Sequence, residues 1–315
     1  MLEWTKPAPT PVRIAFLLFD QFSNLCLANC LEPLRAANTL SRTPLFGWEI
    51  MTPDGQPVLS SSRMQVAPRG ALAALEPVDY LFVLASYDHD RHDNVATRRG
   101  LRQASGRARA TVGLDAAPWL LASAGLLAGK RATVHWDLLE AFTERFLEVE
   151  AERSRVVRDG ALMTCAGAMS ALDMTLDLIA DHAGLALRLD IEALFLRGEP
   201  PVVSPRDHDT VSDPLVRRAL ALMREHQERP LSLPDLARVL SCQPRTLDRR
   251  CRAVLGAPPG RVYRHLRLSA ARKLLEGSAL SVAEVALRCG YESPASMARA
   301  IKAHYGVSPT GLRRA

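Results

Sequence analysis

Asp115 is the residue whose position most strongly suggests chemistry. It lies in GLDAAPWLLASAGLLAGK (113–130), a pattern that predicts the end of a strand, a tight turn and an apolar helix. Several enzyme families place a Ser or Cys nucleophile at the tip of such a turn. Here a carboxylate stands at the tip, so thiolate chemistry is excluded there, and Cys165 belongs to a different strand-end segment. We therefore expect no catalytic residue in this chain.

Two interpretations of Asp115 fit the sequence. The carboxylate can cap a helix that begins near Pro118, a role that needs no ligand. It can instead belong to an effector pocket and anchor a cation there. The elements around the turn must decide between the two.

A second group of candidate residues lies in an internal repeat. LARVLSCQPRTLDRRCRAVLGAPPG (236–260) aligns with VALRCGYESPASMARAIKAHYGVSPTG (285–311), and each copy predicts a short helix, a break and a second helix. A small residue lets the two helices cross closely, and a flexible residue four positions later makes the turn. These residues are Ala237 and Ser241 in the first copy and Ala286 and Gly290 in the second.

Positive charge is concentrated in the same region. Residues 213–315 hold 19 Lys and Arg against 8 Asp and Glu, whereas residues 1–212 hold 21 against 26. Helical spacing places Arg245 and Arg249 opposite the apolar Leu247. A basic helical region beside a mildly acidic body indicates a nucleic-acid-binding domain. A helical bundle with solvated arginines is the alternative.

The stretch between the two copies, GRVYRHLRLSAARKLLEGS (260–278), predicts one long helix that ends around Gly277. A helix of this kind can hold two recognition helices about one turn of DNA apart, roughly 34 Å. One chain would then contact two adjacent major-groove segments.

Residues 231–314 resemble the DNA-binding domain of the AraC/XylS transcription regulators. The resemblance rests on LSLPDLARVLSCQPRTLDRRC, VYRHLRLSAARKLL and SVAEVALRCGYESPASMARAIKAHYGVSPTGLRR. The DNA-binding positions that it implies are Arg245, Asp248, Arg249 and Arg252 in the first motif and Ala295, Ser296, Arg299 and Lys302 in the second. Arg249 is the strongest candidate for a base contact, because arginine pairs with guanine through two hydrogen bonds.

The chain departs from this family at a few positions. Gln243 stands where Ser is usual, and the usual core Phe is replaced at Cys251, Met297 and Ile301. Because Ala295 is small where many members carry a polar side chain, we expect the second motif to discriminate bases less sharply.

The first two-thirds of the chain alternate strand and helix patterns, which predicts an α/β class. RIAFLLF (13–19) is a continuous apolar run, as expected of a strand buried on both faces of a parallel sheet. The further predicted strands are FGWEIMT (46–52), DYLFVLA (79–85), RATVGL (109–114), RATVHW (131–136) and GALMTCAG (160–167), and CLANCLEPLRAANTL (26–40) predicts a helix. The chain contains no GxGxxG and no Walker motif, so we expect no nucleotide cofactor.

Residues 11–195 resemble the DJ-1/PfpI branch of the class I glutamine-amidotransferase-like fold, in the version fused to AraC-type domains. The resemblance is carried by LEPLRAAN, the turn around Asp115, AGLLAGKRATVHW and TCAGAMSALDMTLDLIADH. It implies a flavodoxin-like three-layer sandwich that senses a small metabolite and controls its catabolic genes. The subgroup that this chain resembles includes regulators of glycine betaine, carnitine and arginine use.

The same resemblance places Glu32 beside Asp115. Two adjacent carboxylates repel unless a cation lies between them, and aromatic rings add cation–π contacts to a quaternary ammonium. The predicted effector site is therefore Glu32, Asp115, Trp119, His135 and Trp136. The aromatic residues and His135 have core or structural roles as their alternative.

The predicted organisation is an N-terminal arm (1–10), an effector-sensing domain (11–195), a Pro-rich linker (196–214) and a DNA-binding domain (215–315) with two helix-turn-helix motifs. We expect a cytoplasmic transcription regulator, an activator, whose partners are promoter DNA, a betaine-, carnitine- or arginine-like effector, RNA polymerase and a second copy of the chain. We expect no cofactor, no metal and no membrane contact. The alternatives are a DJ-1/PfpI-type enzyme with an accessory DNA module and a constitutive DNA-binding dimer.

Overall fold

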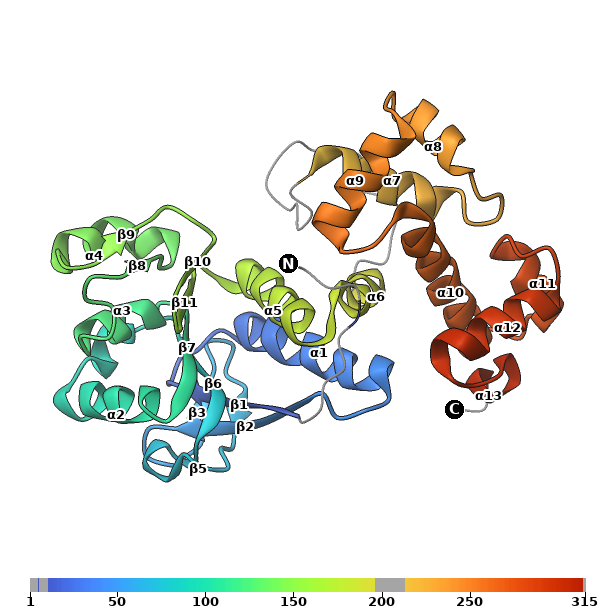
Figure 1. Cartoon of the computed structure of the whole chain (residues 1–315). Coiled ribbons are helices and arrows are strands. Elements are labelled where there is room, and N and C mark those ends of the chain that lie inside the picture. The colour runs from blue at the N-terminus through green and yellow to red at the C-terminus, as the bar shows by residue number, and fades with distance from the viewer. Residues whose placement is uncertain (1–4, 6–10, 196–212, 314–315) are drawn as a thin grey trace. The chain divides into compact units, whose positions relative to one another are not determined.

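The computed structural model describes residue 5 and residues 11–195 and 213–313 (Figure 1). The chain folds as two compact units, and the division between them falls between His182 and Ala183. The predicted arm (1–10) and nearly all of the predicted linker (196–214) lie outside the described residues.

The first unit is built on a seven-stranded sheet with the strand order β10-β11-β7-β6-β1-β2-β5. Every neighbouring pair runs parallel except β10 with β11. The strands are β1 (Val12–Leu18), β2 (Phe46–Thr52), β5 (Gly70–Ala71), β6 (Val78–Ala85), β7 (Ala108–Asp115), β10 (Val156–Asp159) and β11 (Leu162–Cys165). The predicted mostly parallel α/β sheet is confirmed.

Helices cover both faces of this sheet, which gives the predicted three layers. In Figure 1, α1 (Asn24–Ser41) and α5 (Ala168–Ala183) lie on one side, and α2 (Val95–Ser105) and α3 (Ala117–Ser123) lie on the other. Because both faces are covered, β1 is buried almost throughout, which explains its continuous apolar sequence.

The register brings the carboxyl ends of three strands together at Asp115. Ala85 at the end of β6 pairs with Asp115, and Cys165 at the end of β11 pairs with Leu114. In open α/β sheets, ligands bind outside the carboxyl ends of the strands. The residues that follow these strands therefore form the candidate site in this unit.

The prediction of a strand over residues 131–136 is wrong for most of its length. Only Arg131–Ala132 forms a strand, β8, which pairs with β9 (Glu150–Ala151) in a separate two-stranded sheet. The physical reason is that β11 already has a neighbour on each side, because β10 occupies the edge position beside it. Thr133 donates its backbone N–H to the Thr164 hydroxyl instead.

The second unit is entirely helical within its described residues. Its helices are α6 (Leu185–Phe195), α7 (Pro214–Glu225), α8 (Leu233–Val239), α9 (Pro244–Leu255), α10 (Pro259–Gly277), α11 (Val282–Arg288), α12 (Pro294–Tyr305) and α13 (Pro309–Arg313). The pairs α8–α9 and α11–α12 are the two predicted helix-turn-helix motifs, and α10 is the predicted long helix between them.

Matching backbone devices begin and end the second helix of each motif. Pro244 and Pro294 occupy the first turn, where proline costs no hydrogen bond. Gly256 and Gly306 end the helices with left-handed φ angles of 66° and 74°. The turns between the paired helices are also left-handed, with φ of 54° at Ser241 and 67° at Gly290.

Gly290 is more constrained than its counterpart Ser241. A Cβ atom at Gly290 would lie 2.5 Å from the Gln227 carbonyl oxygen and 2.6 Å from Cδ of Pro230. Arg267 of α10 also donates to the carbonyl oxygens of Cys289 and Gly290, at 2.7 and 2.5 Å. The turn of the second motif is therefore packed closely against the segment around Gln227 and Pro230 and against α10.

Gly290→Ala should destabilise the helical unit by about 1–3 kcal/mol, because alanine is unfavourable at the left-handed φ and its Cβ clashes with Gln227. The matched control is Gly277→Ala, where the added Cβ has nothing within 4 Å. Urea unfolding of the full chain followed by far-UV circular dichroism measures the difference. Equal stability of the two variants would contradict this account of the turn.

Candidate DNA-binding helices and effector site

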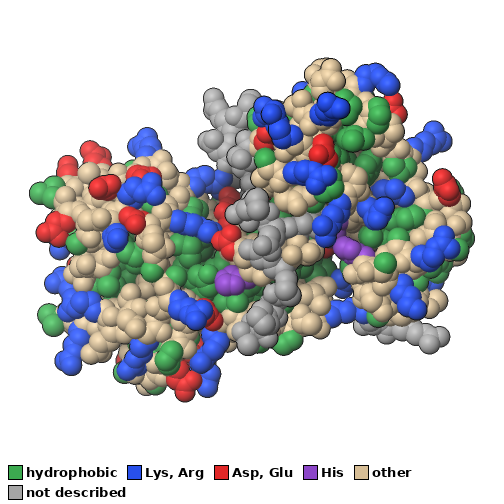
Figure 2. All heavy atoms as spheres, in the orientation of Figure 1, with side chains coloured by type: hydrophobic (Ala, Val, Ile, Leu, Met, Phe, Trp, Pro, Cys, Tyr) green, Lys and Arg blue, Asp and Glu red, His purple; other side chains and the backbone are tan. Residues whose placement is uncertain are grey.

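The second helix of each motif buries one face and exposes the other. In α9 the residues Leu247, Cys251 and Leu255 are buried, and in α12 Met297 and Ile301 are buried. Three of these replace the family's usual Phe, and all three occupy core positions as expected. The predicted cations Arg245, Arg249, Arg252, Arg299 and Lys302 are exposed on the other faces, and Ala295 is exposed as well. In Figure 2, Lys and Arg side chains are spread over the visible face of this unit.

The exposed arginines of α9 differ in whether the protein already neutralises them. Arg252 pairs with Asp248 one turn earlier at 2.8 Å, and Arg250 pairs with Asp213 at 2.7 Å. Within the described part of the chain, the side chains of Arg245 and Arg249 form no hydrogen bond or ion pair. These two guanidinium groups therefore remain available for phosphate or a base edge.

In α12 the residue Ser296 is partly committed to the fold. Its hydroxyl donates to the Ser293 carbonyl oxygen at 2.7 Å and accepts from the Ser293 N–H at 3.4 Å, completing a capping box with Ser293. Among the described residues, Arg299 and Lys302 have no side-chain partner. The sequence did not indicate the capping role of Ser296, because Ser-x-x-Ser is not the usual capping sequence.

In the first unit, β7 ends at Asp115 in a strained turn. The φ angle of Asp115 is 64°, in the left-handed region that non-glycine residues rarely adopt. A Cβ at Gly113 would lie 2.7 Å from Cδ1 of Leu121, so a larger residue would force the Leu121 side chain of α3 to shift. The predicted strand, tight turn and helix are all present.

The helix-cap interpretation of Asp115 is wrong. Helix α3 begins at Ala117, its N-cap residue is Ala116, and no side chain caps it. The Asp115 carboxylate instead accepts a hydrogen bond from the Ser86 hydroxyl at 2.7 Å, and Ser86 in turn accepts from the Ser23 N–H at 3.0 Å. The strained backbone directs the carboxylate away from the α3 N-terminus and towards the end of β6.

Burial raises the pKa of Asp115 above its ordinary value, and the Ser86 hydrogen bond and the nearby His135 and His89 lower it in part. Within the described residues, no Lys or Arg forms an ion pair with Asp115. Burial also raises the pKa values of Cys26 and Cys165, with a smaller contribution from the Asp115 charge. The site is thus a partly buried carboxylate that no Lys or Arg of the described residues neutralises.

His135 and Trp136 lie next to this carboxylate. The His135 N–H donates to the Asp115 carbonyl oxygen at 2.9 Å, and its ring faces the Gly167 backbone. Trp136 is 71% exposed, and the centroid of its ring lies 5.4 Å from that of His135. A large aromatic side chain is thus exposed to solvent beside the Asp115 turn.

Two predicted effector residues are engaged elsewhere. Trp119 packs against Phe146, and the Arg145 guanidinium lies 5.7 Å from the centre of the Trp119 ring. A cation of the protein itself therefore already makes a cation–π contact with Trp119. Glu32 is half-exposed on α1 and pairs with Arg35 at 2.7 Å. Among the described residues, Glu32 makes no hydrogen bond to Asp115 and is not among the groups that perturb its pKa.

The sequence missed Ser86 and His89. Both follow β6, the strand adjacent to β7, and a polar residue directly after DYLFVLA was the signal that could have identified Ser86.

Comparison with known proteins now identifies both units. The model of the DJ-1/PfpI family matches residues 12–181, and that of a helix-turn-helix domain matches residues 236–315. The HTH-type transcriptional regulator CdhR of Pseudomonas aeruginosa is 35% identical over 304 residues, which cover 94% of this chain and 89% of that protein. The chain is an AraC-type transcriptional regulator with an N-terminal DJ-1/PfpI domain.

A further relative agrees with this assignment over the whole regulator. The HTH-type transcriptional regulator GlxA of Rhizobium meliloti is 33% identical and covers 96% of this chain and 95% of its own. The crystal structure of a ThiJ/PfpI family protein from Pseudomonas syringae matches with a TM-score of 0.54 and 21% identity, over 70% of this chain and 88% of that one, and supports the fold alone. The regulator is therefore a DNA-binding protein of the transcription-regulator class.

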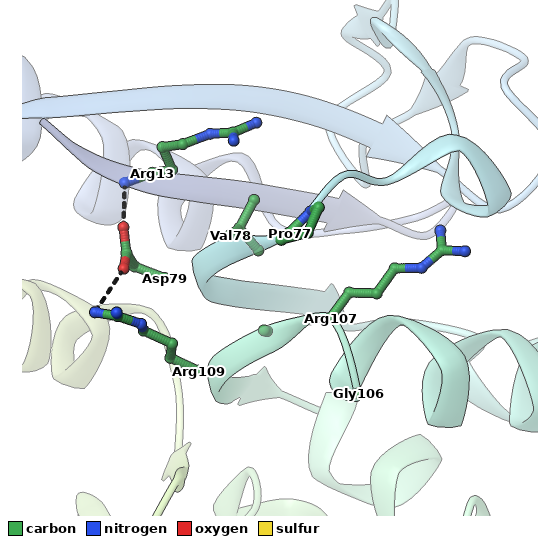
Figure 3. A pocket seen from close by; sticks show the side chains of 8 residues that line it. Arg13, Pro77, Val78, Asp79, Gly106, Arg107 and Arg109 are labelled. Atoms are coloured by element: carbon green, nitrogen blue, oxygen red, sulfur yellow. Dashed lines mark hydrogen bonds and ion pairs between the residues drawn. The ribbon is translucent and has the colours of Figure 1, made fainter.

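The regulator also has a pocket at the other end of its strands. It measures about 350 Å³ and is lined by residues at the amino ends of β1, β6 and β7 (Figure 3). There Asp79 accepts from the Arg13 N–H at 2.9 Å and pairs with Arg109 at 3.3 Å. None of the predicted effector residues lines this pocket.

In the described part of the regulator, no group of three or more His, Cys, Asp or Glu side chains is arranged to hold a metal ion. The His- and Asp-rich segment YDHDRHD (87–93) contains a short 3-10 helix, His89–His92, and the His92 ring contacts the Asp20 carbonyl oxygen. All six cysteines lie within the described residues and are free thiols. None of the described helices has the length and apolar character needed to cross a membrane.

Ser86→Ala should raise the pKa of Asp115 further above its ordinary value, because it removes a hydroxyl that donates to the charged form. A carboxyl with a raised folded-state pKa contributes stability at low pH, and this contribution is lost as the pH rises through that pKa. The substitution should move this loss to higher pH. Carbon-13 NMR titration of the aspartate carboxyl groups measures the pKa directly.

The control is Ser123→Ala, which removes a comparable hydrogen bond to Asp93 at 2.9 Å and should leave the pKa of Asp115 unchanged. A pKa of Asp115 that stays constant or falls in Ser86→Ala would show that Ser86 does not hold the carboxylate in solution.

Proposed function

We propose that the regulator activates transcription of catabolic genes when a small cationic nitrogen compound binds at Asp115. The observation that carries this proposal is the partly buried Asp115 carboxylate, which has no Lys or Arg partner among the described residues. A buried carboxylate without a counter-charge is unfavourable, and a bound cation removes that cost. An anionic effector would increase it.

Exposed apolar side chains on the segments around Asp115 favour a cation with an apolar surface. Tyr87, which follows Ser86, is 65% exposed, and Trp136 is 71% exposed. Met169, at the start of α5, is 53% exposed and reaches the Asn29 side chain at 3.9 Å. Aromatic faces attract quaternary ammonium groups, while the free lone pairs of the carboxylate suit a guanidinium. Betaine-, carnitine- and arginine-like compounds combine these properties.

The chemistry of the site supports sensing without catalysis. Enzymes of this fold use a thiolate at the turn, whereas this chain carries a carboxylate there. Burial raises the pKa of the Cys30 thiol to about 12 and raises that of Cys165 even more, so neither forms a thiolate near neutral pH. A DJ-1/PfpI-type enzyme would need a nucleophile that these groups do not supply.

For the DNA-binding unit, we propose that Arg245 and Arg249 in α9 and Arg299 and Lys302 in α12 enter adjacent major grooves. The proposal is supported by the exposure of these four side chains and by their lack of partners among the described residues. Asp248 orients Arg252 through its ion pair at 2.8 Å, which suits a phosphate contact by Arg252. Ala295 and Ser296 lie at the start of α12, where the groove-facing end of a recognition helix is expected. The regulator would recruit RNA polymerase in the cytoplasm, and a homodimer is the form we expect at the promoter.

The effector proposal is tested by thermal shift of the full chain with betaines, carnitine, arginine and matched anions. A true effector stabilises the folded state by about 2.7 kcal/mol at a concentration one hundred times its Kd. Asp115→Asn should abolish the shift, whereas Glu32→Gln, which alters the surface pair with Arg35, should retain it. Stabilisation by anions alone, or an unchanged shift in Asp115→Asn, would refute the cation site.

The DNA contacts are tested separately. Arg249→Ala and Arg299→Ala should each weaken binding to a DNA site selected from random sequence by roughly 1–3 kcal/mol, measured by fluorescence anisotropy at fixed salt. Arg109→Ala, in an exposed arginine of the first unit, is the control and should bind normally. If both recognition-helix variants bind as tightly as the control, then α9 and α12 do not enter the grooves.

A further inference from the structure

Helix α6 (Leu185–Phe195) falls within the predicted effector-sensing domain (11–195), but the chain divides before it, so α6 belongs to the helical unit. The chain reaches it directly from α5 through Gly184, whose φ is 92°, and its contacts group it with the helical unit. Helix α6 buries Leu185, Leu189 and Ile191. Because an isolated helix of this length is marginal in water, its position depends on what it packs against.

His265 of the long helix α10 is the central contact of α6. Its side chain is 3% exposed. Its Nε2 lies 3.1 Å from Oδ1 of Asp190 and 3.2 Å from the Ala186 carbonyl oxygen, both on α6. Its Nδ1 lies 3.2 Å from Nε2 of His304, on the recognition helix α12. One buried imidazole thus contacts α6 with one nitrogen and α12 with the other.

The chemistry of the ring couples these two contacts. The two acceptors on α6 favour the tautomer in which His265 carries its proton on Nε2. The Nδ1 atom is then an acceptor, and His304 must donate its Nε2–H to it. If α6 moves away, the His265 ring loses the Asp190 carboxylate that fixes its tautomer. The Nδ1 atom is then no longer held as an acceptor for the His304 Nε2–H.

A second bond between α6 and α10 does not pass through this ring. The Lys273 ammonium donates to the Ala193 carbonyl oxygen at 2.7 Å, near the carboxyl end of α6. Around His304, the ring of Tyr305 lies 4.6 Å away, and the Arg272 guanidinium lies 5.3 Å from that tyrosine ring. The relay through His265 can therefore be separated experimentally from general loosening of α6.

We propose that α6 controls how the second recognition helix is seated. The contact from Asp190 through His265 to His304 fixes the carboxyl-terminal end of α12, and Gly184 links α6 to the last helix of the sensor domain. A change in the sensor domain that displaces α6 would alter α12 without any effector contact in the helical unit. The proposal rests on the proposed function only for the origin of the signal.

Hydrogen–deuterium exchange of the full chain, followed by mass spectrometry, tests the relay without DNA or effector. Asp190→Ala should speed amide exchange about tenfold at the carboxyl-terminal end of α12 as well as in α6. Because coupling is reciprocal, His304→Ala should also speed exchange in α6, which contacts His265 through Ala186 and Asp190. Because His304 is exposed, its substitution should not unfold the protein. The His304→Ala experiment therefore still tests the relay if Asp190→Ala lowers overall stability.

The matched control is Lys273→Ala, which weakens the α6–α10 contact without touching His265. It should speed exchange in α6 and leave α12 as in the wild type. If Asp190→Ala affects α6 alone, or if His304→Ala leaves α6 unchanged, the relay is refuted whatever the effector proves to be. Failure of the cation screen with a positive exchange result would refute only the effector site.

Discussion

The left-handed turn at Asp115 is the constraint on which the DJ-1/PfpI domain depends. A non-glycine residue at a φ of 64° costs free energy, and the surrounding strands must hold it in place. Gly113 lets β7 approach α3, and the pairing of Ala85 with Asp115 fixes the end of the turn against β6. The result is a carboxylate held at the carboxyl edge of the sheet, bound to Ser86 and free of α3. A polypeptide that relaxed this turn would lose the position of the Asp115 carboxylate.

Each unit carries candidate functional groups whose charge is not neutralised by a described partner, negative in the first unit and positive in the second. In the DJ-1/PfpI domain, burial raises the pKa of Asp115, which no described Lys or Arg neutralises. On the recognition helices, Arg249 and Arg299 extend from exposed faces without a described acidic partner, while neighbours such as Arg250 and Arg252 are paired. A molecule that leaves these particular charges unmatched is suited to bind a cation in one unit and a polyanion in the other.

The helical unit combines rigid parts with one adaptable contact. Left-handed turns at Ser241 and Gly290 and glycine ends at Gly256 and Gly306 fix each motif independently of any signal. The His265–His304 pair is different, because an imidazole has two tautomers and satisfies its neighbours in only one arrangement at a time. Helix α6 supplies the carboxylate that selects this arrangement. Such a contact provides a device for regulation within an otherwise fixed scaffold.

The sequence by itself determined the strand and helix order, the two helix-turn-helix motifs with their turn residues, and the exposed arginines, because these follow from local periodicity and backbone preference. It over-extended one strand, at residues 131–136, since it could not show that β11 already had two neighbours. Only the tertiary structure decided that Asp115 accepts a hydrogen bond from Ser86 and does not cap α3. It also decided that the Arg145 guanidinium lies over the Trp119 ring and that Glu32 pairs with Arg35. These contacts depend on which side chains of separate elements meet and on how deeply each is buried. A local sequence pattern encodes neither of these properties.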